Sequence, residues 1–168
     1  MRTWTGVSEG QRWTSNGEWI NIGGDRNWRN NNPGNLEAGE FARRHGAIGT
    51  DGRFAIFPDY PTGRNALISL LKTETYQSLT IAAAIERFAP GIENDVLSYM
   101  RFICKECNLT LHVVLSAMSA AELDGLAAAI EKFEGTRRGI TCSVDDQCAP
   151  EVVLRIQQLL NAQRISTK

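Results

Sequence analysis

The stretch from Ser119 to Gly135 carries the strongest folding signal in this sequence. Glu122 follows Ser119 by three residues, which is the pattern of a helix capping box. At about 100° per residue the apolar side chains of the stretch fall on one stripe, and Gly135 is a residue type that commonly ends helices. The sequence therefore predicts an amphipathic helix over residues 120–134, whose apolar face has to be buried against other elements.

Other segments repeat this helical periodicity. Further helices are predicted at 63–74, at 80–88 with Thr80 as N-cap, at 93–107, at 112–117 and from Pro150 onward. The turn signal Gly49-Thr50-Asp51-Gly52 precedes alternating apolar residues and predicts a small β-hairpin between residues 36 and 57.

The first 35 residues are rich in Asn, Gly and Trp and have little apolar periodicity. We expect irregular structure there, with residues 1–28 forming an N-terminal arm that is held down by tryptophans. The complete prediction is a single domain over residues 1–168 of the α+β class, mostly helical, with one small β-hairpin.

Composition narrows the classes of function. The 168 residues are 42% apolar, carry a formal net charge of −1, and hold no apolar run near the roughly 18 residues of a membrane span. Nucleic-acid binders usually carry a clear basic excess, so neither membrane insertion nor nucleic acid is expected. Residues 1–20 lack the apolar core of a Sec signal peptide, so export by that route is not predicted.

The four cysteines form two close pairs. Cys142 and Cys148 flank a polar loop that a disulfide could close in an oxidising compartment. Cys104 and Cys107 fall on the apolar side of a predicted helix, where thiols commonly pack as small apolar groups. A zinc site would need a tighter second spacing, and we expect no metal and no cofactor.

Glu134 is the leading candidate for chemistry. It falls inside the apolar stripe of helix 120–134, in the last turn, whereas Glu131 lies at the edge of the stripe. Desolvation and the negative end of the helix dipole would both raise the pKa of Glu134, which suits a glycosidase general acid. The alternative is a Glu that turns to solvent or pairs with Arg137 and Arg138.

Glu93 is the second candidate carboxylate, because it precedes or opens a helix whose N-terminus favours the ionised form. A protonated acid and an ionised partner together form a typical glycosidase pair. A simple capping role for Glu93 or Asn94 is the alternative.

The loop Arg29–Leu36 is too rich in amides to be core. Asn32 and Asn35 offer donors and acceptors suited to the hydroxyl and N-acetyl groups of a sugar. A turn network in which these amides satisfy the backbone is the alternative.

Short motifs add a resemblance that covers about residues 29–138. They are Arg29–Asn35 (RNNNPGN), Gly52–Phe57 (GRFAIF), Gly63–Ala66 (GRNA), Ala89–Asn94 (APGIEN) and Tyr99. Together they resemble a family of lysozyme-like, lytic transglycosylase-like proteins of phages and secreted enzymes. The family ends in a helix carrying His-Glu-Asn-Gly, which Phe133-Glu134-Gly135 resembles at the acidic residue.

The resemblance implies a lysozyme-like fold and a peptidoglycan glycoside hydrolase that cleaves the β-1,4 glycan backbone. Its implied catalytic residues are Glu134 and Glu93, and its implied substrate contacts are Asn32, Asn35, Asn94 and Tyr99. A weaker similarity to flagellar-type N-acetylglucosaminidases favours N-acetylglucosaminidase specificity. Their catalytic Glu precedes the hairpin, which would make Glu9 a further candidate.

A wall hydrolase without a Sec signal is similar to the antibacterial effectors that type VI secretion systems inject. That similarity implies action in the periplasm of a target bacterium and a cognate periplasmic immunity protein as partner. The alternatives are a muramidase or lytic transglycosylase on the same fold, and a non-catalytic virion or wall-binding module.

Overall fold

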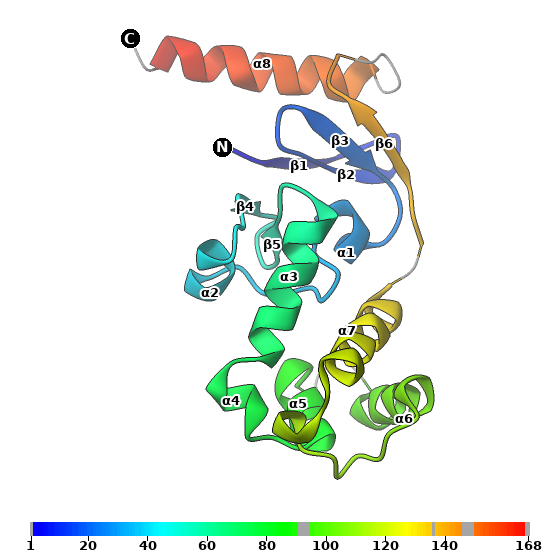
Figure 1. The fold of residues 1–168 in the computed structure, drawn as a ribbon. Helices are drawn as coiled ribbons and strands as arrows, with labels where there is room; N and C mark the ends of the chain where they lie inside the picture. The colour runs from blue at the N-terminus through cyan, green and yellow to red at the C-terminus, as the bar shows by residue number, and fades with distance from the viewer. Residues whose placement is uncertain (1, 91–94, 136, 146–149, 167–168) are drawn as a thin grey trace.

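The computed structural model describes residues 2–90, 95–135, 137–145 and 150–166, which form an α+β protein (Figure 1). The helices are α1 (Arg26–Arg29), α2 (Glu40–Arg44), α3 (Tyr60–Leu71), α4 (Glu74–Gln77), α5 (Ile81–Phe88), α6 (Val96–Cys107), the 3-10 turn η1 (Leu115–Ala117), α7 (Ala120–Glu134) and α8 (Pro150–Ser166). The strands are β1 (Trp4–Ser8), β2 (Gln11–Ser15), β3 (Trp19–Ile22), β4 (Gly49–Thr50), β5 (Ala55–Ile56) and β6 (Ile140–Ser143).

Most predicted helices are confirmed, and their caps explain where they begin. The Ser119 side chain accepts from Glu122 N while the Glu122 side chain accepts from Ser119 N, so the capping box of α7 is present. Thr80 caps α5 as predicted. The α3 helix begins earlier than expected because the side chain of Asp59 accepts from Thr62 N at 2.8 Å.

The helices from α3 to α7 enclose the larger hydrophobic core. Its members include fully buried side chains from α3, α5, α6 and α7, such as Leu67, Ile85, Ile103 and Ile130. The predicted hairpin is confirmed as the pair β4–β5, which contributes Ala55 to the same core. This core fixes the C-terminal end of α7 against the hairpin and the loop that precedes it.

The prediction of an irregular N-terminal arm is wrong. β1, β2 and β3 form an antiparallel meander, and β6 pairs with β3 to give a four-stranded sheet of order β1-β2-β3-β6. Glu9 and Gly10 form the β1–β2 turn with positive φ angles of 48° and 75°. These strands were not predicted because the buried residues Thr14, Ser15 and Asn21 are polar, so the segment shows no alternation of apolar and polar residues.

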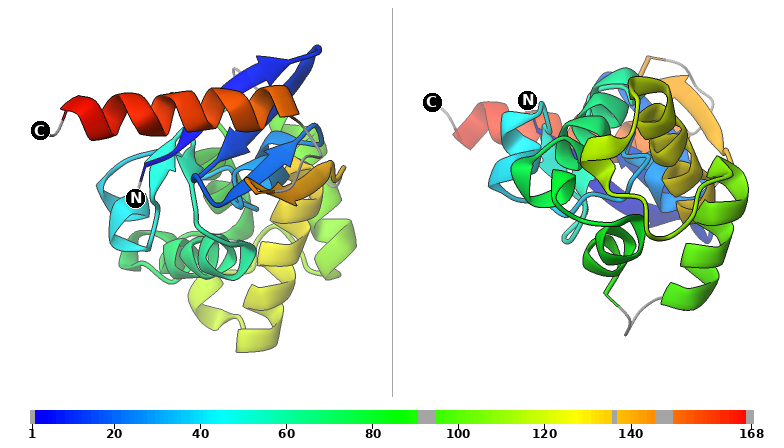
Figure 2. Two further views of the ribbon diagram at one scale, coloured as in Figure 1. Left: turned by 90° about the horizontal axis from the view of Figure 1, so that it is seen from above. Right: turned by 60° about the horizontal axis from the view of Figure 1, so that its bottom comes forward.

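A second hydrophobic core lies between this sheet and α8. It joins Trp13 and Ile20 to Cys142 and Val144 and to the α8 residues Val152 and Ile156, and Figure 2 shows α8 lying across the sheet. Cys142 is disulfide-bonded. Cys148, the partner that the sequence suggested, lies outside the described residues, so that pairing stays a prediction. Cys104 and Cys107 are free thiols.

The segment after α7 joins the two cores. Asp25 N donates to Arg137 O at 2.8 Å, and Arg137 N donates to Asp25 Oδ2 at 2.8 Å. Gly24, at φ +65°, allows this crossing, because a Cβ there would lie 2.6 Å from Gly139 N. That the two cores form one domain remains a prediction.

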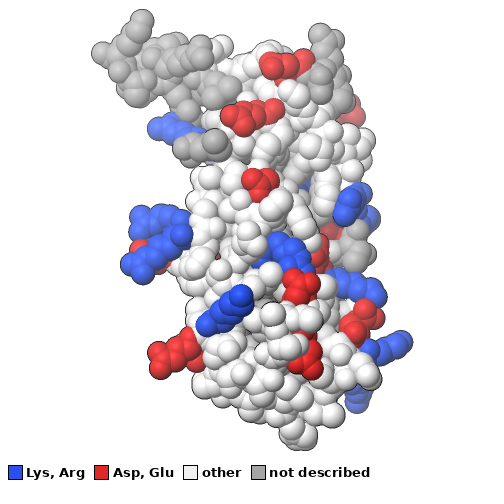
Figure 3. Space-filling view, viewed as in Figure 1, with Lys and Arg blue, Asp and Glu red and all other residues white. Residues whose placement is uncertain are grey.

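Surface features agree with the compositional argument. On the face seen in Figure 3, Lys and Arg lie interspersed with Asp and Glu instead of gathering into one broad basic surface. Within the described ranges, none of the helices has the length and apolar character needed to cross a bilayer.

Candidate active site

Glu134 is the last residue of α7 and lines a cavity of about 290 Å³. Its side chain is half-buried, and each carboxyl oxygen accepts one hydrogen bond. Asn35 Nδ2 donates to Oε2 at 2.8 Å, and Tyr99 OH donates to Oε1 at 3.0 Å. The structure therefore brings together Asn35, Tyr99 and Glu134, three residues that the sequence predicted to belong to the site.

Burial raises the pKa of Glu134 above the ordinary value of a glutamate, while the hydrogen bonds from Asn35 and Tyr99 oppose that shift. Burial prevails, so the protonated form persists to a higher pH than in water. The alternative pairing with Arg137 is not adopted, since Arg137 Nη2 lies 3.3 Å from Asp25 Oδ1. The burial and the raised pKa predicted for Glu134 are confirmed.

Asn35 holds its amide toward Glu134 from an unusual backbone position. Its φ of +46° is left-handed, a conformation that Asn adopts more readily than most residues. Its Oδ1 is buried and makes no hydrogen bond within the described protein. Buried acceptors are usually paired, so this oxygen is free to accept a hydrogen bond from a ligand beside the Glu134 carboxyl.

Tyr99 supports Glu134 from the core side. Its ring is fully buried and stacks on Phe133 with centroids 3.8 Å apart. Burial, followed by the charge of Glu134, raises the pKa of Tyr99 far above that of free tyrosine, so the hydroxyl remains a donor. The prediction of Tyr99 as a substrate contact is wrong, because the fully buried side chain positions the carboxyl instead.

Asn32 also differs from its predicted role. It is completely buried, and its Nδ2 donates to Leu36 O and Ala55 O at 2.9 Å each. Its Oδ1 accepts from Leu36 N at 2.9 Å. These bonds to the backbone hold the loop against the hairpin, so Asn32 is scaffold and cannot reach a substrate.

Glu9 and Glu131 lie away from the Glu134 cavity. Glu9 is exposed in the β1–β2 turn. Glu131 lines a different cavity and accepts a hydrogen bond from Tyr60 OH at 2.7 Å. Glu93 and Asn94 lie outside the described residues, so their predicted roles stay predictions.

Sequence reasoning missed three charged residues that line the Glu134 cavity, which are Glu37, Arg53 and Arg87. Arg53 Nε lies 3.1 Å from Glu37 Oε1. Glu37 also forms an isolated β-bridge with Phe54, which continues the hairpin toward the cavity. The motif Gly52–Phe57 was the available signal, since it marked the segment that carries Arg53.

The cavity combines apolar and polar walls. The aromatic rings of Phe54, Tyr76 and Phe88 line it together with the charged residues. In the part of the chain that the structure describes, no cluster of three or more His, Cys, Asp or Glu side chains is arranged to hold a metal ion. The described lining residues supply a carboxyl group of raised pKa and hydrogen-bond donors, which suit proton transfer.

Comparisons with known proteins add no family to this geometry. No protein-family model matches the chain, and no curated protein sequence matches it.

Proposed function

We propose that this protein is a glycoside hydrolase that cleaves the β-1,4 glycan backbone of peptidoglycan, with Glu134 as general acid. The observation that carries the proposal is the Glu134 carboxyl, which has a raised pKa and accepts hydrogen bonds from Asn35 and Tyr99 at the wall of a cavity. General acids of glycosidases hold a proton near neutral pH, and burial shifts the pKa of Glu134 in that direction.

The hydrogen bonds also fit the course of such a reaction. Glu134 gives its proton to the glycosidic oxygen as the bond from that oxygen to the anomeric carbon breaks. Charge then develops on the carboxylate, and charge-assisted bonds from Asn35 Nδ2 and Tyr99 OH become stronger. Water adds its hydroxyl to the anomeric carbon, and the proton released restores Glu134 to its acid form through solvent.

A second carboxylate is present among the described lining residues. Glu37, which is ion-paired with Arg53, would stabilise the positive charge that develops on the sugar ring in the transition state. The rings of Phe54 and Phe88 add apolar surface to the same wall. These residues support a carbohydrate ligand beyond the acid alone.

The resemblance in sequence supports the finer assignments. The last residue of a helix meets a β-hairpin across the cavity, which is compatible with the lysozyme-like fold that the motifs imply. N-acetylglucosaminidase specificity and delivery as an antibacterial effector with a periplasmic immunity protein also come from the resemblance. The disulfide at Cys142 fits an oxidising compartment such as the periplasm.

Digestion of purified sacculi followed by mass spectrometry tests the proposal. We expect soluble fragments with N-acetylglucosamine at the reducing end. A muramic acid reducing end indicates a muramidase, and an anhydro ring indicates a lytic transglycosylase. Protein that binds sacculi yet releases no fragments would refute the enzyme and select a wall-binding module.

A further inference from the structure

A second cavity, of about 350 Å³, lies between the four-stranded sheet and the β4–β5 turn. Four arginines line it, and Asp51 is the one carboxylate among its described lining residues. Arg12 comes from β2, Arg26 and Arg29 come from α1, and Arg53 comes from the turn. Such guanidinium groups are suited to bind oxyanions with paired hydrogen bonds.

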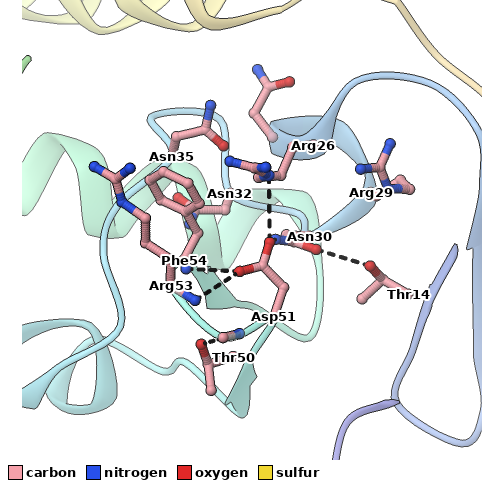
Figure 4. A network of polar contacts seen from close by, with 12 residues as sticks. Thr14, Arg26, Arg29, Asn30, Asn32, Asn35, Thr50, Asp51, Arg53 and Phe54 are labelled. Carbon is pink, nitrogen blue, oxygen red and sulfur yellow. Dashed lines mark hydrogen bonds and ion pairs between the residues drawn. The ribbon is translucent and has the colours of Figure 1, made fainter. Parts of the chain in front are cut away.

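Asp51 is already occupied by partners within the protein, as Figure 4 shows. Its carboxylate accepts from Phe54 N at 2.8 Å and from Asn30 Nδ2 at 2.8 Å, and it lies 3.6 Å from Arg26 Nε. Burial alone would raise its pKa, but these hydrogen bonds hold the pKa of Asp51 below its ordinary value. Arg53 is paired with Glu37, and the single carboxylate of Asp51 cannot neutralise Arg12, Arg26 and Arg29 together.

The arginines themselves report the excess of positive charge. Arg29 is buried, and its Nη1 donates to Gly23 O and Gly24 O at 3.2 and 2.6 Å. Burial, followed by the charges of Arg12 and Arg26, lowers the pKa of Arg29. Among the described residues, no carboxylate lies within ion-pair distance of Arg12. An anion would relieve this repulsion.

Position connects this cavity to the candidate active site. Arg53 lines both cavities, and its ion pair with Glu37 lies on the Glu134 side. When a glycan strand occupies the Glu134 cavity, a substituent on that strand would therefore reach the neighbouring cavity that the arginines line. Peptides attached to the glycan of peptidoglycan carry free carboxylates.

We propose that the arginine cavity is a subsite for a carboxylate of the peptide carried by the glycan strand. The substrate class is then peptide-bearing glycan in preference to bare glycan. This inference rests on the proposed function for its substrate, but the cavity and its charge stand independently of catalysis.

Binding measurements on full-length protein carrying Glu134→Gln test the subsite without turnover. The probes are soluble peptide-bearing glycan fragments, the same fragments after amidase has removed the peptides, and inorganic phosphate. Isothermal titration calorimetry measures the affinity of the protein for each probe. Adding Arg12→Gln and Arg26→Gln together should weaken binding of peptide-bearing fragments about tenfold, as expected for lost contacts between arginine and a charged acceptor. Binding of peptide-free fragments should not change.

Two further variants make the result decisive. Arg101→Gln removes one exposed positive charge from α6, away from the cavity, and should leave both affinities unchanged. Arg12→Gln alone should weaken binding of peptide-bearing fragments about threefold. This single variant replaces the double variant if circular dichroism shows that the double variant does not fold.

Equal binding of both fragment types, with or without the arginines, overturns the subsite. Arginine-dependent binding of phosphate without any preference for peptide-bearing fragments replaces the carboxylate by a phosphate ligand and also overturns it. If wild-type protein cleaves no glycan but still prefers peptide-bearing fragments through Arg12, the proposed function fails and the subsite stands.

Discussion

The last turn of α7 presents two glutamates, three residues apart, to two different cavities. Glu134 is held by Asn35 and the fully buried Tyr99, and burial raises its pKa. Glu131 meets the exposed hydroxyl of Tyr60, and its cavity also contains Lys132. The surroundings of a carboxyl therefore depend on which side of one helical turn it faces, and not only on its place near the helix end.

Glu134→Gln should produce the largest effect. Gln keeps the shape of the side chain but has no proton to deliver, so cleavage of sacculi should fall by at least the roughly 100-fold to 10,000-fold that general acid catalysis contributes. Fragment release is the measurement, with circular dichroism to confirm folding. Near-normal digestion would remove Glu134 from the mechanism and redirect attention to Glu37 and Glu93.

The same variant has a signature in stability. Because the folded-state pKa of Glu134 is raised, the native protein binds more protons than the unfolded chain between the two pKa values. The free energy of unfolding therefore decreases as pH rises through that window, and Glu134→Gln should remove this decrease. Thermal unfolding from pH 4 upward measures it, and identical pH profiles for both proteins would contradict the assigned pKa direction.

Asn32 and Asn35 form the next comparison. Asn32→Ala removes three buried hydrogen bonds to the backbone of Leu36 and Ala55, so the free energy of unfolding should fall by at least about 1 to 3 kcal/mol. Activity per folded molecule should change little. Asn35→Gly tolerates the positive φ but removes the donor to Glu134, so activity should fall about tenfold or more with a smaller loss of stability.

Chemical denaturation and sacculus digestion of both variants decide this pair. A large loss of activity per folded molecule for Asn32→Ala would contradict its purely structural role. Unchanged activity of Asn35→Gly would show that the amide does not assist Glu134.

Tyr99→Phe sharpens the comparison through pH dependence. The hydroxyl favours the charged form of Glu134, so its removal should raise the pKa of Glu134 further. An enzyme that needs the protonated acid loses activity as pH rises through this pKa, so the alkaline limb should move to higher pH. Activity at neutral pH should fall about tenfold, because the developing carboxylate loses one donor. An unchanged alkaline limb would separate Tyr99 from catalysis.

Sequence predicted the helical part of this protein well because its signals are local. Caps at Thr80 and Ser119 and apolar periodicity define α5 and α7 without information from distant residues. The burial of Glu134 followed from the same periodicity, since its position in the apolar stripe already implied it.

The sheet and the loop were beyond such reasoning because their partners are distant in the chain. β3 pairs with β6 about 120 residues later, as in Ile20 with Cys142. Asn32 and Asn35 are the same residue type three positions apart, and only their tertiary partners separate scaffold from site. The arginine cavity likewise gathers Arg12, Arg26 and Arg53 from three elements.

Glu131→Gln should have the smallest effect and is the control on which the comparison depends. Gln keeps an oxygen that can accept from Tyr60 OH, and the contact is exposed, so the free energy of unfolding should change by less than about 0.5 kcal/mol. Cleavage should stay within about twofold of wild type, because Glu131 lies outside the Glu134 cavity.

A titration of Tyr60 tests whether Glu131→Gln changes the cavity that Glu131 lines, even though cleavage should stay near normal. Burial first, then the hydrogen bond and charge of Glu131, raise the pKa of Tyr60, so Glu131→Gln should lower that pKa toward the ordinary tyrosine value. Tyrosinate absorbance against pH, compared with a Tyr60→Phe variant to assign the transition, measures the shift. A lowered Tyr60 pKa with full activity confines the chemistry to the Glu134 side of the turn. A loss of cleavage that matches that of Glu134→Gln would instead show that both sides of the helix act in one reaction.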